Sequence, residues 1–103
     1  MALKALLLRK KIDDKKAALA TLRAKDEEFK TREAEYAAAI DEIDENTSAE
    51  DRSALEEAVN AFDAEHTAHR DAEAAAEAEI AEMEAELAEE EARQDTTPPA
   101  NTD

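Results

Sequence analysis

The sequence contains no cysteine, no glycine and no tryptophan, and it has only two prolines in 103 residues. Without cysteine it cannot form a disulfide scaffold, a thiolate metal site or a cysteine nucleophile. Without glycine it lacks the phosphate-cradling loops of nucleotide-binding proteins. It also lacks the residue that usually supplies positive φ in tight β-turns. These absences exclude several enzyme classes and argue against a β-sheet protein.

Large apolar residues are also scarce. Apolar residues make up 43% of the chain, but 26 of these 44 are alanine, which leaves 18 larger ones. Ordering a chain costs roughly 1–2 kcal/mol per residue, and a globular domain of this length normally buries more apolar surface to offset it. We therefore expect neither an enzyme nor a bound cofactor. Alanine, glutamate, leucine, lysine and arginine dominate, which is typical of coiled coils and long helices.

The chain carries 29 acidic and 13 basic residues, for a formal net charge of −16. This charge argues against nucleic acid and anionic membranes as general partners. The opening apolar run is too short for a secretory signal, and the basic residues follow it instead of preceding it. No stretch approaches the ~20 apolar residues of a membrane span. We therefore expect a cytosolic protein.

The apolar residues recur in steps of three, four and seven, which predicts two helical stripes. The predicted fold is all-α, with helices over about 2–45 and 48–93 joined by a turn at 45–48. A short connection favours an antiparallel helical hairpin or coiled coil over residues 1–93, and the segment 94–103 is expected to be a flexible linker. Polar residues interrupt the first stripe at Lys15, Asp26 and Glu33. The predicted seam consists of Ile12, Leu19, Leu22, Phe29, Tyr36, Ile40, Ile43, Leu55, Val59, Phe62, Ile80, Met83 and Leu87.

The predicted turn carries helix-start signals. Thr47 followed by Glu50 matches a capping box, and Ser48 with Asp51 is a second option. Asn46 tolerates a left-handed helix end better than most residues. We expect this to be the only break in the first 94 residues.

Charge supports an antiparallel pairing of the two helices. Residues 1–25 hold eight bases and two acids, whereas residues 71–95 hold one base and eleven acids. A hairpin places these segments side by side, with Phe29 opposite His66 and Tyr36 opposite Val59. The same complementarity can act between chains, so an extended intermolecular coiled coil stays an alternative.

Two histidines offer the only candidate chemistry. His66, His69 and Glu73 share one helix face, a spacing compatible with metal binding. With no further histidine or cysteine to complete a tetrahedral site, the favoured interpretation is two histidines in a loosely packed seam, and no metal site is predicted. A pH-responsive role is the other alternative, because histidine titrates near neutrality.

Four leucines make the first helical turns apolar on most sides. A helix that is apolar all round tends to be buried, and a hairpin offers it only one partner face. We therefore predict contact with another chain or domain, the alternative being a frayed terminus. The predicted contact residues are Leu3, Leu6, Leu7 and Leu8.

Several stretches together carry a family resemblance. The opening Met-Ala-Leu-Lys-Ala-Leu-Leu-Leu-Arg-Lys-Lys-Ile-Asp-Asp is followed by Leu-Arg-Ala-Lys-Asp-Glu-Glu-Phe (22–29) and Arg-Glu-Ala-Glu (32–35). After the acidic turn come Ala-Leu-Glu-Glu-Ala-Val (54–59) and Phe62. Over roughly residues 1–93 the chain resembles the N-terminal delta, or scaffolding, domain of tailed-bacteriophage major capsid proteins of the Hong Kong phage type.

This resemblance implies a function. Such a domain directs procapsid assembly through helical self-association and is then removed by the maturation protease. The implied partners are other copies of the chain, the capsid shell domain, the portal and the protease, inside a procapsid in the bacterial host cytoplasm. The interrupted seam suits such weak association. Two other functions stay open: a cytosolic coiled-coil adaptor for an unrelated protein, and a weak metal- or pH-responsive module acting through His66 and His69.

Overall fold

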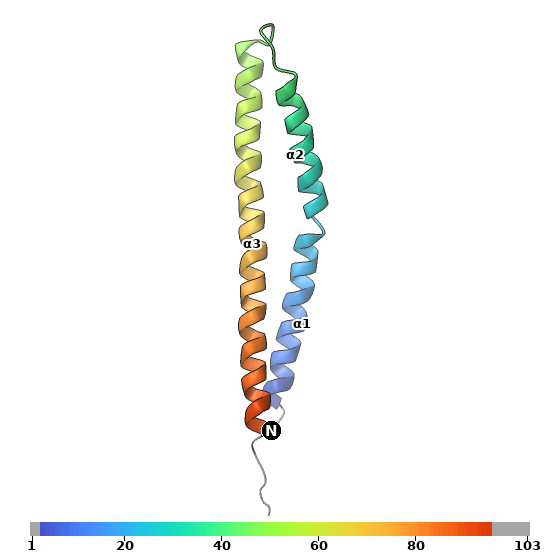
Figure 1. Ribbon diagram of the computed structural model, residues 1–103, viewed down its shortest axis with the longest axis vertical. Coiled ribbons are helices and arrows are strands. Elements are labelled where there is room, and N and C mark those ends of the chain that lie inside the picture. The colour runs from blue at the N-terminus through green and yellow to red at the C-terminus, as the bar shows by residue number, and fades with distance from the viewer. Residues whose placement is uncertain (1–2, 96–103) are drawn as a thin grey trace, which may run out of the picture. The chain divides into compact units, whose positions relative to one another are not determined.

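The computed structural model describes residues 3–95, which form three helices and two connections (Figure 1). The helices are α1 (Leu3–Arg23), α2 (Asp26–Asp41) and α3 (Ala49–Asp95). There is no strand among these residues, which confirms the predicted all-α class. None of the described helices is sufficiently long and apolar to span a bilayer. The predicted linker 94–103 begins two residues too early, because α3 continues to Asp95; the rest of that segment lies outside the described residues.

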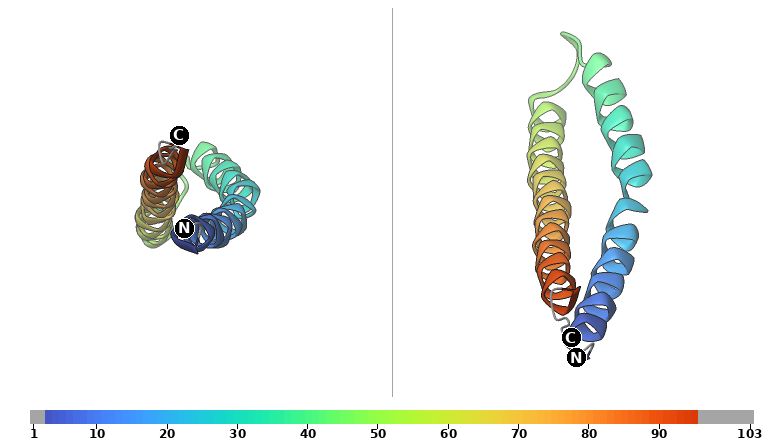
Figure 2. Two further views of the ribbon diagram at one scale, coloured as in Figure 1. Left: turned by 90° about the horizontal axis from the view of Figure 1, so that it is seen from below. Right: turned by 60° about the horizontal axis from the view of Figure 1, so that its bottom comes forward.

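The predicted first helix, over 2–45, is wrong in one respect: it is interrupted between α1 and α2, and α2 ends at Asp41 (Figure 2). The Lys25 amide donates to the Leu22 carbonyl at 3.0 Å, a bond that spans three residues instead of four. The next helix then begins with Asp26 and two glutamates in its first turn, where acidic side chains favour the positive end of the helix dipole. No glycine or proline marks this break, and the apolar pattern continues through it. The sequence therefore predicted one continuous helix.

The turn between α2 and α3 is held by its own polar side chains. The Asn46 amide donates to Asp44 Oδ1 and the Asp44 amide to Thr47 Oγ1, both at 2.9 Å. The Asp51 amide donates to Ser48 Oγ at 3.0 Å. Ser48 is therefore the N-cap of α3, and the predicted capping role of Thr47 is wrong because its hydroxyl stabilises the turn.

Three further residues belong to the turn and the start of α3. Asn46 does not adopt a left-handed conformation, since no non-glycine residue between 3 and 95 has positive φ. Glu50 lies in the first turn of α3, where its charge still complements the helix dipole. Arg52 closes the turn from α3, because its Nε donates to the Thr47 carbonyl at 3.4 Å and its Nη2 to the Asp44 carbonyl.

The described residues divide into two units: 3–21 with 73–95, and Leu22–Ala72. In the first unit, α1 lies antiparallel to the second half of α3. Oppositely charged side chains join the two helices, with Lys15 Nζ 2.5 Å from Glu79 and Lys16 Nζ 3.1 Å from Glu84. The predicted charge pairing therefore forms within one chain. The apolar residues buried in this unit are Ala5, Leu8, Ile12, Leu19 and Ile80.

The second unit is a helical hairpin made of α2, the turn and the first half of α3. Phe29 and Phe62 are buried, whereas Ile40 is 47% exposed, so its predicted place in the seam is wrong. Arg32 and Ala39 are half-buried, while Glu33 is exposed. A strict seven-residue pattern drifts against the 3.6-residue turn of a straight helix. The face of α2 that meets α3 therefore passes through positions 32 and 39 instead of 33 and 40.

The remaining seam residues are less buried than Phe29 and Phe62 and less exposed than Ile40. Each is partly covered by the facing helix, and none is fully exposed. This agrees with the predicted stripe, although the packing is shallow. The half-buried members are Leu22, Tyr36, Ile43, Leu55, Val59, Met83 and Leu87.

Candidate functional site

The centre of the second unit is a cluster of aromatic rings. Phe29 and Phe62 lie with ring centroids 6.0 Å apart, and Tyr36 lies 5.3 Å from Phe62. His66 stacks on Phe29 at 5.2 Å, and His69 stacks on it at 4.5 Å. The two histidines are thus packing partners of phenylalanine, in agreement with the interpretation that they belong to the seam.

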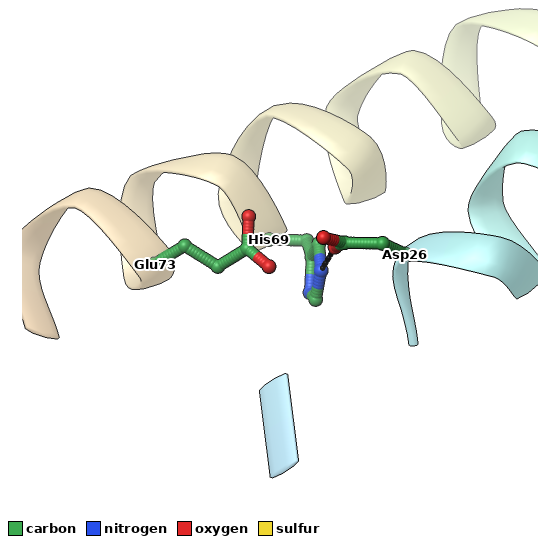
Figure 3. Close-up of side chains that lie close together, drawn as sticks. All are labelled: Asp26, His69 and Glu73. Carbon is green, nitrogen blue, oxygen red and sulfur yellow. Dashed lines mark hydrogen bonds and ion pairs between the residues drawn. The ribbon is translucent and has the colours of Figure 1, made fainter. Parts of the chain in front are cut away.

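His69 is the buried polar side chain of this cluster, with 8% of its surface exposed. Its Nε2 lies 2.8 Å from Asp26 Oδ1, in the first turn of α2 (Figure 3). A buried polar group needs such a partner, and the aspartate that interrupts the predicted seam provides it. Glu73 lies one turn further along α3 and belongs to the other unit. Within the second unit, His69 therefore has Asp26 as its polar partner and Phe29 as its stacking partner.

Arg32 covers the rings from outside and was missed by the sequence analysis. Its guanidinium carbon lies 5.5 Å from the Phe29 centroid and 5.0 Å from that of Phe62. It also binds Glu65 through two hydrogen bonds, from Nη2 at 3.0 Å and from Nη1 at 3.2 Å. Such a fork is among the stronger surface contacts. The hydrogen bond lowers the pKa of Glu65 and raises the pKa of Arg32.

We expect Glu65→Gln to flatten the acid limb of the pH–stability curve. Because the folded-state pKa of Glu65 is lowered, its contribution is present above the ordinary carboxyl pKa and is lost as pH falls through the folded value. The wild-type free energy of unfolding should therefore decline more steeply than that of the variant below about pH 4.5. Urea unfolding followed by circular dichroism between pH 2 and 7 measures this. Glu57→Gln, which removes the same charge from an exposed position of α3, is the control, and identical curves for the two variants would contradict the assignment.

Apolar side chains leave a hollow of about 280 Å³ next to the turn. Its apolar lining residues are Ile40, Ile43, Leu55 and Val59, and its polar ones are Arg52, Glu56 and Asn60. A further hollow of about 310 Å³ shares two of these residues, so the helices are incompletely packed on both sides here. Ligand pockets typically measure about 300–1,000 Å³. The hollow suits a few inserted side chains better than a whole metabolite.

The predicted contact leucines divide into two groups. Leu3, Leu6 and Leu7 are 66%, 54% and 56% exposed, as expected for positions off the seam. Leu8 is only 6% exposed, so its prediction as a partner contact is wrong, because it packs within its own unit. We call Leu3, Leu6 and Leu7 the leucine face.

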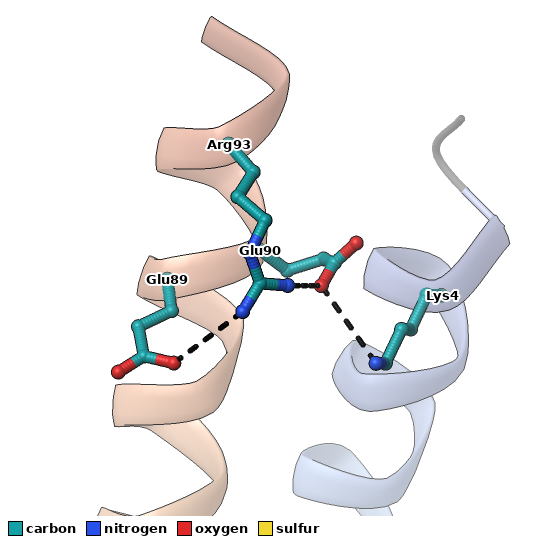
Figure 4. Close-up of polar contacts among 4 residues, drawn as sticks. All are labelled: Lys4, Glu89, Glu90 and Arg93. Carbon is teal, nitrogen blue, oxygen red and sulfur yellow. Dashed lines mark hydrogen bonds and ion pairs between the residues drawn. The ribbon is translucent and has the colours of Figure 1, made fainter. Parts of the chain in front are cut away.

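Ion pairs fix the helix end that bears the leucine face. Glu90 lies between Lys4 Nζ, at 3.9 Å, and Arg93 Nη1, at 2.7 Å, and Arg93 also pairs with Glu89 at 3.8 Å (Figure 4). The Glu90 side chain is only 15% exposed. Of these pairs, Lys4–Glu90 joins α1 to α3, and Arg9 also pairs with Glu91 of α3, so the first turns of α1 are tied to the last turns of α3.

No family model, curated protein or solved structure matches the chain. Function must therefore be argued from the surfaces themselves. Among the described residues, the exposed large apolar side chains are those of the leucine face and Ile40. These two places are the candidate interaction sites.

Proposed function

We propose that this chain is a helical self-association module that guides the assembly of a larger structure, and that this structure is a bacteriophage procapsid. One observation carries the proposal: three leucines, each more than half exposed, lie together on the first turns of α1. Adjacent exposed leucines of this kind mark an interaction surface more often than isolated ones do.

The size of this surface indicates weak association. Full burial of a leucine side chain contributes about 1.5–3 kcal/mol, and part of each of these side chains is already covered. Stable interfaces bury about 1,200–2,000 Å², which three leucines alone do not reach. A contact of this kind forms and dissociates readily, as an assembly guide requires.

The procapsid assignment rests on the resemblance to delta domains and on the acidic surplus of the chain. In this role, copies of the chain associate while the capsid shell domain forms the particle, and the maturation protease later removes the guide. A net charge of −16 repels incoming DNA, which gives removal a physical purpose. Portal and protease are the further partners in this proposal.

The test replaces all three leucines of the leucine face with serine. Sedimentation of the wild-type chain across a wide concentration range should show growing oligomers, and the triple variant should stay monomeric with unchanged helicity. Particle assembly with the shell protein, examined by electron microscopy, should fail for the variant. A wild-type chain that is monomeric at every concentration would refute self-association, and normal particles from the variant would refute the procapsid role. Oligomers of the wild-type chain together with normal particles from the triple variant would instead favour an adaptor for an unrelated protein.

A further inference from the structure

We propose that the leucine face of one copy docks into the apolar hollow beside the α2–α3 turn of a second copy, giving head-to-tail association. The inference rests on the proposed self-association and names the two surfaces that meet. The occupant of the hollow is therefore a second copy of this chain, through Leu3, Leu6 and Leu7.

The hollow has the properties of a receptor for side chains. Its apolar wall consists of Ile40, Ile43, Leu55 and Val59, none of which is buried within the hairpin. At about 280 Å³, the hollow accepts protruding leucines without repacking the hairpin.

Charge selects this pairing over leucine face to leucine face. Residues 3–11 carry four bases and no acid, whereas residues 41–57 carry eight acids and one base. Lys4 and Arg9 already pair with Glu90 and Glu91 of α3 in the same chain, so Lys10 and Lys11, both exposed beside the leucine face, are the bases that can meet a second copy. Arg52 and Glu56 both line the hollow, within a segment that is acidic overall. Two leucine faces would bring Lys10 and Lys11 of both copies together, whereas head-to-tail docking brings these lysines to the acidic segment 41–57. Complementary charge steers encounter and suppresses the wrong partner.

Head-to-tail contact predicts a particular kind of oligomer. The two surfaces are different, so the interface is heterologous and each copy can bind two others. Chains of increasing length should therefore form as concentration rises. Because exposed charges contribute, added salt should weaken the association.

The experiment disables one surface at a time in the full chain. Leu6→Gln removes part of the leucine face, and Ile40→Gln removes part of the hollow wall; glutamine keeps helix propensity and adds no charge. Each variant alone should associate about tenfold more weakly than wild type. Ala18→Gln in α1 and Ala38→Gln in α2, at exposed positions of the same helices, are the matched controls and should associate as wild type does. Circular dichroism verifies that all four variants are helical.

Mixing the two variants decides between the possible pairings. The Ile40→Gln chain keeps an intact leucine face and the Leu6→Gln chain keeps an intact hollow. An equimolar mixture should therefore form dimers, and only dimers, at concentrations where neither variant associates alone. If Ile40→Gln associates like wild type, or if mixing restores nothing, the hollow is not the receptor and the inference fails, although self-association through the leucine face still stands. A monomeric wild type would overturn both.

Discussion

Replacing Phe62 with alanine is expected to destabilise the second unit by about 3–5 kcal/mol, the cost typical of truncating a buried phenylalanine. Phe62 is 3% exposed and lies at the centre of the cluster, next to Phe29, Tyr36 and His66. Arg32 also rests on its ring. The variant therefore loses apolar burial, aromatic contacts and a cation–π contact together.

The consequence is large because little else holds this hairpin. Small domains are stable by about 5–15 kcal/mol in all, and helices without a packing partner are marginal in water. We expect amide exchange in α2 to become much faster and urea unfolding to shift to lower concentrations. Phe62→Leu, which keeps a large apolar side chain, should cost less than the alanine variant. An alanine variant within about 1 kcal/mol of wild type would contradict the central role of this ring.

The broad fold could be predicted from the sequence because its cause is local and repetitive. Apolar residues at steps of three and four leave α3 no alternative to a long helix, and the basic first quarter and acidic last quarter specify an antiparallel pairing. Lys15 and Glu79 pair as that charge pattern predicted. Burial of Ile12 and Ile80 likewise follows from the periodicity alone.

The break between α1 and α2 could not be predicted, because its cause is not a helix-breaking residue. Leu22 and Lys25 are ordinary helix formers, and the interruption consists of one hydrogen bond of shorter span. The acidic residues Asp26-Glu-Glu are a helix-start signal in the sequence. The apolar pattern continues through them, however, and predicts an uninterrupted helix. The same continuous seven-residue pattern placed Ile40 in the seam, whereas the 3.6-residue turn of α2 leaves Ile40 exposed.

The contacts around the aromatic cluster depend on the exact register of the helices, so the sequence predicted only some of them. Pairing of Phe29 with His66 was predicted and is confirmed by their stacked rings. Asp26 was interpreted as a defect in the seam, yet it binds His69. Arg32 was not considered, because a position one residue from the predicted seam cannot be assigned to the inner face by periodicity.

The leucine face and the hollow have a common physical origin. The helices do not cover all 18 large apolar residues of the chain: Leu3, Leu6, Leu7 and Ile40 stay exposed, and these are the residues to which we assign the proposed contacts. Ile40 stays exposed at the hollow, and an extra turn of leucines leaves the leucine face uncovered. A more complete core would close both surfaces, so the proposed association between copies would follow from the same composition as the weak internal packing.

Replacing Ile12 with alanine is expected to destabilise the first unit by about 2–5 kcal/mol, whereas Leu7→Ala on the same helix should change stability by no more than about 0.5 kcal/mol. Both substitutions favour the helix slightly, so the comparison isolates burial. Ile12 is 5% exposed and Leu7 is 56% exposed.

The two variants should differ in opposite ways in amide exchange and in association. At low concentration, amide exchange over residues 3–21 should accelerate for Ile12→Ala and stay unchanged for Leu7→Ala. At high concentration, sedimentation should show weakened association for Leu7→Ala with its helicity intact. If Leu7→Ala instead unfolds the helix at low concentration, Leu7 serves the unit's own packing. A surface for a second copy would then have to be sought elsewhere on the chain.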